Sequence, residues 1–207
     1  GTLGDANKAL TYYEQALAMY KLINGDKPHS IIANSLNNLG DTYKKLGDDT
    51  TAMVYYEQSL AMRKLIYGDK PHPDIANNLN DLGSACNALG DTNKAIPYFE
   101  QSLLMYKLIY GDKPHESINV ILNNLGDAIN FLGDHHQAIA YYEQSLGMNK
   151  LIYGDTPHES ISIIQNKLGD ALKSLGDHHQ AIAYYEQSLA INKLIYGDKP
   201  HESITII

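Results

Sequence analysis

Residues 68–83 read GDKPHPDIANNLNDLG, and the first five letters of this stretch recur along the whole chain. GDKPH also begins at Gly25, Gly111 and Gly197, and GDTPH begins at Gly154, so the copies stand 43 residues apart. Self-similarity at a fixed period of this size is typical of repeat architectures. The sequence therefore predicts an array built from one 43-residue repeat.

The first half of each repeat has the periodicity of an amphipathic helix, which we call helix A. In the first complete repeat Leu36, Leu39, Tyr43 and Leu46 stand three or four residues apart, which places them on one face of a helix. Gly47 follows this face and is suited to end the helix as a C-cap glycine.

A second, longer helix, helix B, is predicted to follow. Asp48 is placed to accept hydrogen bonds from the free N–H groups at its start, and Asp5, Asp91, Asp134 and Asp177 recur in the same role. Ala52 and Tyr56 lie on its buried stripe, and Gly68 ends it. The Lys-Pro step of GDKPH cannot be helical, so this phrase links helix B to the next helix A. Pro97 falls inside one B helix and is expected to bend it slightly.

The register of the repeat divides the chain into parts. We expect one solenoid over residues 1–207 that begins in the middle of a repeat, as though cut from a longer protein. Its parts are a half repeat at 1–29 (helix B and linker), complete repeats at 30–72, 73–115, 116–158 and 159–201, and the start of a further helix A at 202–207.

The repeat resembles the tetratricopeptide repeat. That family's signature has Leu-Gly and then Tyr on the first helix, and Ala with an aromatic four residues later on the second; Leu39, Gly40, Tyr43, Ala52 and Tyr56 match these positions. The signature Trp is replaced by leucine or, once, by glutamine. The 43-residue length is similar to the long repeats of kinesin light chains and nephrocystin-3-like proteins. The resemblance implies an all-α fold, a right-handed superhelical solenoid of antiparallel helix pairs, that binds proteins or extended peptides.

In this family the face of helix A opposite the leucines lines a concave groove. The polar residues predicted for it are Asn34, Asn37, Asp41, Lys44, Asn77, Asn80, Asn87, Asn123, Asp127, Asn130, Asn166, Asp170 and Lys173. Asparagine recurs in one column at residues 37, 80, 123 and 166, and an amide can both donate to and accept from the backbone of an extended peptide. The alternative is that these amides bond only to neighbouring helices or water.

Selectivity among partners is expected where the repeats differ. Tyr20 and Tyr106 stand where another repeat has Arg63, and we interpret the two tyrosines as candidate ligand contacts. Other columns diverge at Val120, Phe131 and Ile163.

The nine histidines do not predict a metal site. His135/His136 and His178/His179 are adjacent pairs, whereas two ligands on one helix need a spacing of three or four. The remaining histidines follow the proline of each linker, and we interpret them as structural caps of helix A: His29, His72, His115, His158 and His201. A catalytic residue has no reason to recur in every repeat.

Composition narrows the function classes further. The net charge of −8 argues against nucleic acid, because phosphate binding needs a basic surface. Cys86 is the only cysteine, which fits a reducing cytoplasm, and we expect it to be an inert buried thiol. No apolar run is long enough to span a membrane. Without a phosphate loop, nucleophile motif or paired carboxylates outside the repeat, we expect no enzyme and no cofactor.

The sequence therefore predicts a non-enzymatic scaffold for proteins or peptides. Two alternatives stay open. Both ends of the chain would expose surface built to receive another repeat, so the array could be a spacer or rod that associates head to tail. It could also be the sensor array of a larger signalling protein.

Overall fold

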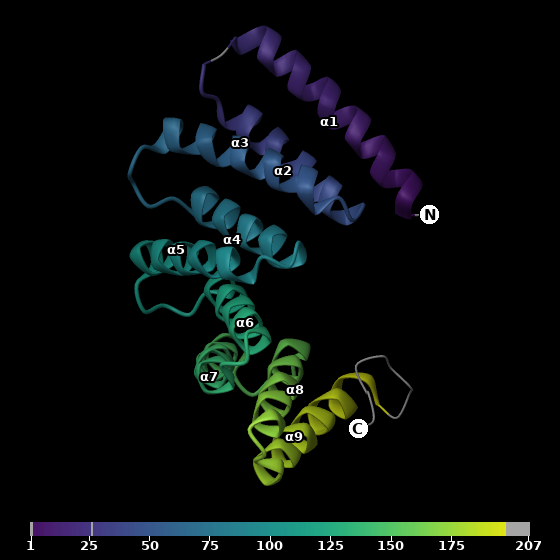
Figure 1. The fold of residues 1–207 in the computed structure, drawn as a ribbon, viewed down its shortest axis with the longest axis vertical. Coiled ribbons are helices and arrows are strands. Elements are labelled where there is room, and N and C mark those ends of the chain that lie inside the picture. The colour runs from purple at the N-terminus through teal and green to yellow at the C-terminus, as the bar shows by residue number, and fades with distance from the viewer. Residues whose placement is uncertain (1, 26, 198–207) are drawn as a thin grey trace. The chain divides into compact units, whose positions relative to one another are not determined.

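The computed structural model describes residues 2–25 and 27–197, with the side chains of 2–7 left aside, and this part of the chain is helical apart from short connections. The helices are α1 (Thr2–Asn24), α2 (Ser30–Lys45), α3 (Asp49–Tyr67), α4 (Pro73–Ala88), α5 (Thr92–Tyr110), α6 (Glu116–Phe131), α7 (His135–Tyr153), α8 (Glu159–Ser174) and α9 (His178–Tyr196). Figure 1 shows them following one another as hairpins. The all-α helix-pair fold is thus confirmed.

The chain forms two compact units, residues 1–111 and 112–207, which we call the N-terminal and C-terminal units. Helices α2, α4, α6 and α8 are the A helices, of 16 residues each, and α3, α5, α7 and α9 are the B helices, of 19. Pro97 is accommodated within α5, which is as long as the other B helices. Over the described residues no helix is both long and apolar enough to cross a membrane.

The turn from helix A to helix B is closed by a glycine and an aspartate. Gly47 has φ +81°, a left-handed conformation that glycine adopts without strain. The N–H of Asp48 donates to the carbonyl of Tyr43 at 3.0 Å, and the Asp48 carboxylate accepts from the N–H of Thr51 at 3.0 Å. Asp134 and Asp177 cap α7 and α9 in the same way. These caps were predicted correctly.

Asp91 is an exception to the predicted caps. Its side chain makes no capping hydrogen bond to α5. One carboxylate oxygen lies 2.9 Å from the ammonium of Lys94, the residue three positions on, whose counterparts Thr51, Gln137 and Gln180 carry no charge. The ion pair draws the carboxylate away from the backbone, and the N–H of Lys94 donates instead to the Asp91 carbonyl.

Helix α1 also departs from the prediction. It runs without a break from Thr2 to Asn24, so Asp5 lies inside the helix and does not cap it. In the other turns the aspartate N–H donates to a carbonyl five residues earlier, as Asp48 does to Tyr43. The predicted head-to-tail association depends on the side chains of 2–7 and on 198–207, which lie outside the described residues.

Each described linker ends on a histidine that caps the next A helix. Nδ1 of His72 accepts from the N–H of Asp74 at 3.2 Å, and His29, His115 and His158 make the same bond to the residue two positions on. The ring of His72 stacks on Tyr67 with centroids 3.5 Å apart, and His158 stacks on Tyr153 at 3.6 Å. The capping role is confirmed for these four; His201 lies outside the described residues.

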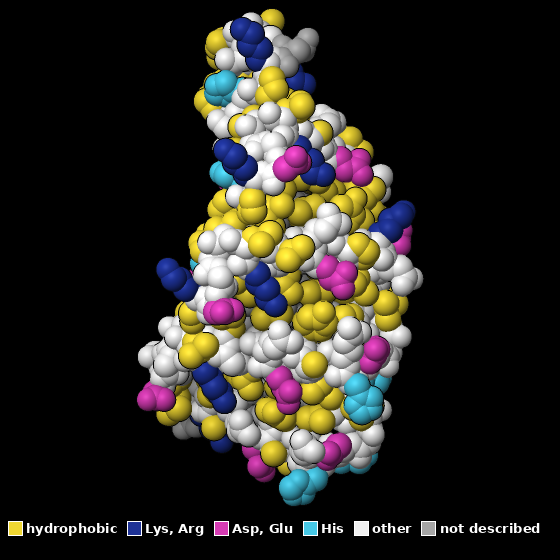
Figure 2. Space-filling model, turned by 90° about the vertical axis from the view of Figure 1, so that its left-hand side faces the viewer, with side chains coloured by type: hydrophobic (Ala, Val, Ile, Leu, Met, Phe, Trp, Pro, Cys, Tyr) yellow, Lys and Arg dark blue, Asp and Glu magenta, His cyan; other side chains and the backbone are white. Residues whose placement is uncertain are grey.

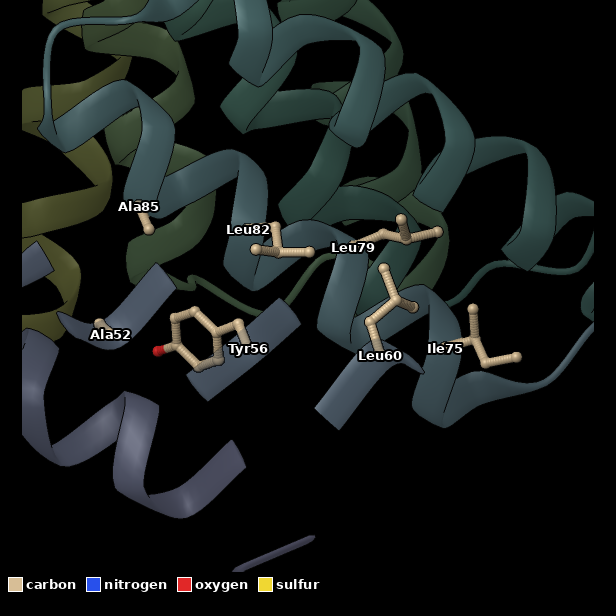
Figure 3. Packing of buried hydrophobic residues seen from close by; sticks show 7 residues of the cluster. All are labelled: Ala52, Tyr56, Leu60, Ile75, Leu79, Leu82 and Ala85. Atoms are coloured by element: carbon tan, nitrogen blue, oxygen red, sulfur yellow. The ribbon is translucent and has the colours of Figure 1, made fainter. Parts of the chain in front are cut away.

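The core lies between each A helix and the B helices on either side of it within a unit. Figure 3 shows one such layer, in which Ala52, Tyr56 and Leu60 of α3 point toward Ile75, Leu79, Leu82 and Ala85 of α4. Helix A approaches its partner closely at its glycine, because a Cβ on Gly40 would stand 2.5 Å from the ring of Tyr56. The same packing recurs between Gly83 and Phe99.

A buried serine ties each B helix to its A helix. The hydroxyl of Ser59 donates to the carbonyl of Ala33 at 2.8 Å, and Ser102 and Ser188 repeat this bond to the residue 26 positions earlier. Ser145 donates instead to the side chain of Asn119. Because these groups are fully buried, each bond removes the cost of an unsatisfied polar atom. The serines thereby fix the axial register of the hairpin.

Candidate functional site: the polar face of the A helices

The predicted groove residues all lie on the A helices, and none of them is buried. Asn34, Lys44, Asn77, Asp170 and Lys173 are exposed. The others, Asn37, Asp41, Asn80, Asn87, Asn123, Asp127, Asn130 and Asn166, are half-buried. The buried residues of the same helices, such as Leu36 and Leu39 of α2, lie on the opposite face. We call this set of polar residues the A face.

In the N-terminal unit a buried arginine holds residues of the A face in place by hydrogen bonds. Arg63 of α3 donates to the side-chain oxygens of Asn34 at 3.2 Å and Asn37 at 3.3 Å, and to the carbonyl of Asp74 at 2.6 Å. It thereby links α2 to α4. The amide nitrogen of Asn37 in turn donates to Asp81 of α4 at 3.3 Å. Both ends of the Asn37 amide are thus engaged within the protein.

The packing aromatic of helix B reaches the same face with its hydroxyl. Tyr56 donates to Asp41 at 2.8 Å, Tyr142 to Asp127 at 2.8 Å, and Tyr185 to Asp170 at 2.6 Å. Burial, together with the acceptor carboxylate, raises the pKa of these tyrosines. They therefore remain neutral donors that orient the aspartate on the A face. The second complete repeat lacks this pair, because Phe99 and Ser84 stand in the two positions.

Two carboxylates approach each other on the N-terminal A face. Asp41 of α2 and Asp81 of α4 line a pocket of about 420 Å³ together with Lys44, Lys45 and Tyr56. Burial, and then the neighbouring charge of Asp41, raises the pKa of Asp81 to about 6. Neither lysine lies within ion-pair distance of the two aspartates, so the like charges are not neutralised by direct contact.

The corresponding place in the C-terminal unit holds a lysine. Residues 123, 127, 142 and 167 stand two repeats after 37, 41, 56 and 81. The ammonium of Lys167 lies 2.8 Å from the side-chain oxygen of Asn123 and 2.6 Å from the carboxylate of Asp127. It also stands 6.0 Å from the centroid of the Tyr142 ring. One column of the repeat thus carries opposite charges in the two units.

The predicted groove asparagines therefore have two kinds of contact. Asn37 and Asn123 bond to the neighbouring A helix through Asp81 and Lys167, which is the alternative that the sequence left open. Asn87 and Asn130 bond within their own hairpins, Asn87 to Thr92 at 2.8 Å and Asn130 to His135 at 2.7 Å. The amides are held in fixed orientations on an accessible face.

Two of the positions at which the repeats differ are placed otherwise than expected. Tyr106 is only 1% exposed and its hydroxyl donates to Asn77, so the interpretation of this residue as a ligand contact is wrong. Arg63 in the same column is also buried. The column that holds Arg63 and Tyr106 points into the interface between helices A and B. Its long side chains therefore contact A-face residues only from the buried side. Val120, Phe131 and Ile163 are exposed, by 50%, 75% and 40%.

Sequence reasoning missed the column that contains Asp81 and Lys167. A signal was available, because this column reads Asn38, Asp81, Asn124 and Lys167 and so reverses its charge, whereas most of the repeat is constant. It stands next to the asparagine column but was not among the predicted groove residues.

The other candidate chemistry is local and structural. Among the described residues no three His, Cys, Asp or Glu side chains are grouped to hold a metal ion. Cys86 is buried, as predicted, with its sulfur 3.8 Å from that of Met53, and burial raises the pKa of the thiol.

The B helices present a second accessible surface, which is apolar. A leucine near the end of each is exposed by 65–86%, at residues 22, 65, 108, 151 and 194. Figure 2 shows one face of the molecule, where hydrophobic side chains alternate with scattered single charges. This leucine column is the same in every repeat, so it offers no means of distinguishing one position from another.

Comparisons with known proteins agree with this architecture. The chain is similar to the crystal structure of BtubC (BKLC) from P. vanneervenii, with a TM-score of 0.84 and 21% identity, over 100% of this chain and 81% of that one. It is similar to a Podosopora anserina protein of nearly identical TPR-like repeats named for kinesin light chain, with a TM-score of 0.79 and 22% identity, over 94% and 90% of the two chains. For MamA the values are 0.66, 19%, 94% and 92%.

No curated protein matches the sequence. A tetratricopeptide repeat family model matches residues 2–65 and 117–194, and a second model of the same description matches residues 76–107. These matches cover most of the chain and fall on the helix pairs described above. The chain therefore belongs to the tetratricopeptide repeat family.

Proposed function

We propose that this protein is a non-enzymatic scaffold, working in the cytoplasm, that binds an extended segment of a partner protein on the A face. Tetratricopeptide repeats are in general protein-interaction scaffolds, which makes the class of function plain. The use of the A face in particular is our inference.

One observation carries this proposal. Every polar residue predicted for the A face is accessible, and many of them are held in place by a neighbour. Arg63 orients Asn34 and Asn37 from below, and tyrosine hydroxyls orient Asp41, Asp127 and Asp170. Donors and acceptors that are already oriented lose little entropy when they bind a peptide backbone, which favours association.

The two units offer different chemistry to a partner. The column that holds Asn34 and Asn77 in the N-terminal unit holds Val120 and Ile163 in the C-terminal unit, and both apolar residues are exposed. Exposed apolar side chains within a polar face are typical of binding surfaces. We infer that a partner meets polar groups on one unit and apolar contacts on the other.

Selection of peptides displayed on phage, followed by fluorescence anisotropy on the best binders, tests this function. We expect Asn166→Ala and Val120→Asp to weaken binding, because both alter the A face. Matched controls on exposed B-helix positions, Gln58→Ala and Gln101→Ala, should leave affinity unchanged. Peptides that lose affinity only with B-helix variants, such as Leu65→Ser and Leu108→Ser, would place binding on the leucine column and contradict the proposal.

A further inference from the structure

We propose that the pocket lined by Asp41, Tyr56 and Asp81 binds an ammonium group, supplied by a lysine side chain of a partner protein. This inference rests on the proposed use of the A face and names the chemistry that one part of it recognises.

The molecule itself contains an occupied counterpart of this site. In the C-terminal unit the ammonium of Lys167 sits against Asn123 and Asp127, beside the ring of Tyr142. The N-terminal unit repeats the carboxylate and the ring as Asp41 and Tyr56, whereas the oxygen of Asn37 already accepts from Arg63 and its nitrogen donates to Asp81. The carboxylate and the aromatic ring that lie beside a cation in one unit are therefore present in the other without the lysine.

The residue that replaces the lysine strengthens the case. Asp81 is a second carboxylate, so the site in the N-terminal unit has two carboxylates where the C-terminal unit has one. Both carboxylates line a pocket of about 420 Å³. Burial, and then repulsion by the like charge of Asp41, raises the pKa of Asp81. An ammonium between the two carboxylates would remove that repulsion.

The two lysines that line the pocket, Lys44 and Lys45, do not pair directly with Asp41 or Asp81. Lys44 and Lys45 are exposed and line the pocket, but neither ammonium lies within 4.0 Å of the Asp41 or Asp81 carboxylate. The charge of the chain as a whole is −8, which favours the approach of cationic partners.

The test uses the peptide acetyl-Ala-Ala-Lys-Ala-Ala-amide and the same peptide with norleucine in place of lysine. Carbon-detected NMR follows the side-chain carboxyl signals of Asp41 and Asp81 in the full chain. We expect saturable shifts of both signals with the lysine peptide, with a dissociation constant in the millimolar range, and none with the norleucine peptide.

Two variants make the result decisive. Asp81→Lys places an ammonium of the chain itself in the pocket, as Lys167 does in the C-terminal unit. It should abolish the shift of the Asp41 signal, while the far-ultraviolet circular dichroism spectrum of the folded protein stays unchanged. Lys167→Asp should create a second binding site, so that the carboxyl signal of Asp127 also shifts when the lysine peptide is added. The proposal is overturned if the lysine peptide leaves Asp41 and Asp81 unmoved, if norleucine works equally well, or if Asp81→Lys titrates like the parent protein.

The failure of this inference can be told from failure of the proposed function. If displayed peptides bind the A face but carry no basic residue, and the lysine peptide does not shift Asp81, the scaffold function stands and the lysine pocket does not. If displayed peptides respond only to B-helix variants, the A-face function itself fails.

Discussion

The ammonium of Lys167 lies 2.6 Å from the carboxylate of Asp127, whereas two repeats earlier Asp81 stands in the place of the lysine and faces Asp41. The helices around the two pairs are the same length and are capped in the same way. The charge at this one position of the repeat, residue 81 or 167, therefore decides whether the two neighbouring A helices attract or repel each other there.

This relationship predicts that Asp81→Lys stabilises the N-terminal unit. The new ammonium would pair with Asp41 and remove the repulsion between the two carboxylates, and a partly exposed pair of this kind contributes up to about 1 kcal/mol. Thermal unfolding followed by far-ultraviolet circular dichroism should show a higher midpoint. Lys167→Asp is the mirror-image control and should lower it; a lower midpoint for both variants would contradict the assignment.

The raised pKa of Asp81 predicts a stability that depends on pH. The carboxyl binds its proton more tightly in the folded protein, with a pKa of about 6, than at its ordinary value of 3.8. Between these values the native state carries more protons than the unfolded state, so this group stabilises the fold as the pH falls from about 7 to about 5, and its contribution is lost as the pH rises through 6.

Urea unfolding of the parent protein and of Asp81→Asn at both pH values measures this effect. We expect the parent to gain stability relative to the variant at the lower pH, because asparagine cannot titrate. Comparing the two proteins cancels the contribution of the histidines, which both share. An identical pH dependence in the two would show that Asp81 does not titrate in this range.

Close packing at the A-helix glycine predicts a large cost for adding one methyl group. Gly83→Ala places a Cβ 2.6 Å from the ring of Phe99, and the overpacking should destabilise the protein by about 1–3 kcal/mol. Gly147→Ala is the matched control within α7, because its Cβ would meet no atom within 4 Å and three other copies of the repeat carry alanine there, at residues 18, 61 and 190. That variant should instead be more stable, by about 0.5–1 kcal/mol.

The buried arginine predicts a graded loss when it is shortened. Arg63→Ala removes the hydrogen bonds to Asn34, Asn37 and the Asp74 carbonyl, and a buried acceptor left unpaired costs about 1–3 kcal/mol. Arg63→Asn should cost less, because the corresponding Asn149 donates to the carbonyl of Ser160 in the next A helix. Equal destabilisation by the two variants, measured by urea unfolding, would argue against this role.

Much of the fold was predictable from local sequence. Leucines at spacings of three and four, a glycine at each helix end and an aspartate or histidine at each start act within a few residues, so the helix pairs, the histidine caps and the face that carries the groove residues could be read directly. Asp91 departs from this rule because a neighbouring lysine competes for its carboxylate, and Asp5 lies within a continuous helix.

The chemistry of the A face was decided by tertiary structure. Whether Tyr106 is a ligand contact or a buried donor depends on which interface its column faces, and that is set by the packing of one helix on another. Residues 44 positions apart, such as Asn37 and Asp81, meet only because consecutive A helices lie side by side. The repeat by itself determined the helix pairs and their caps. Contacts between repeats decided which polar residues are held by hydrogen bonds, which form ion pairs, and where two carboxylates lie close together. These contacts join residues that are distant in sequence, so the repeat alone does not specify them.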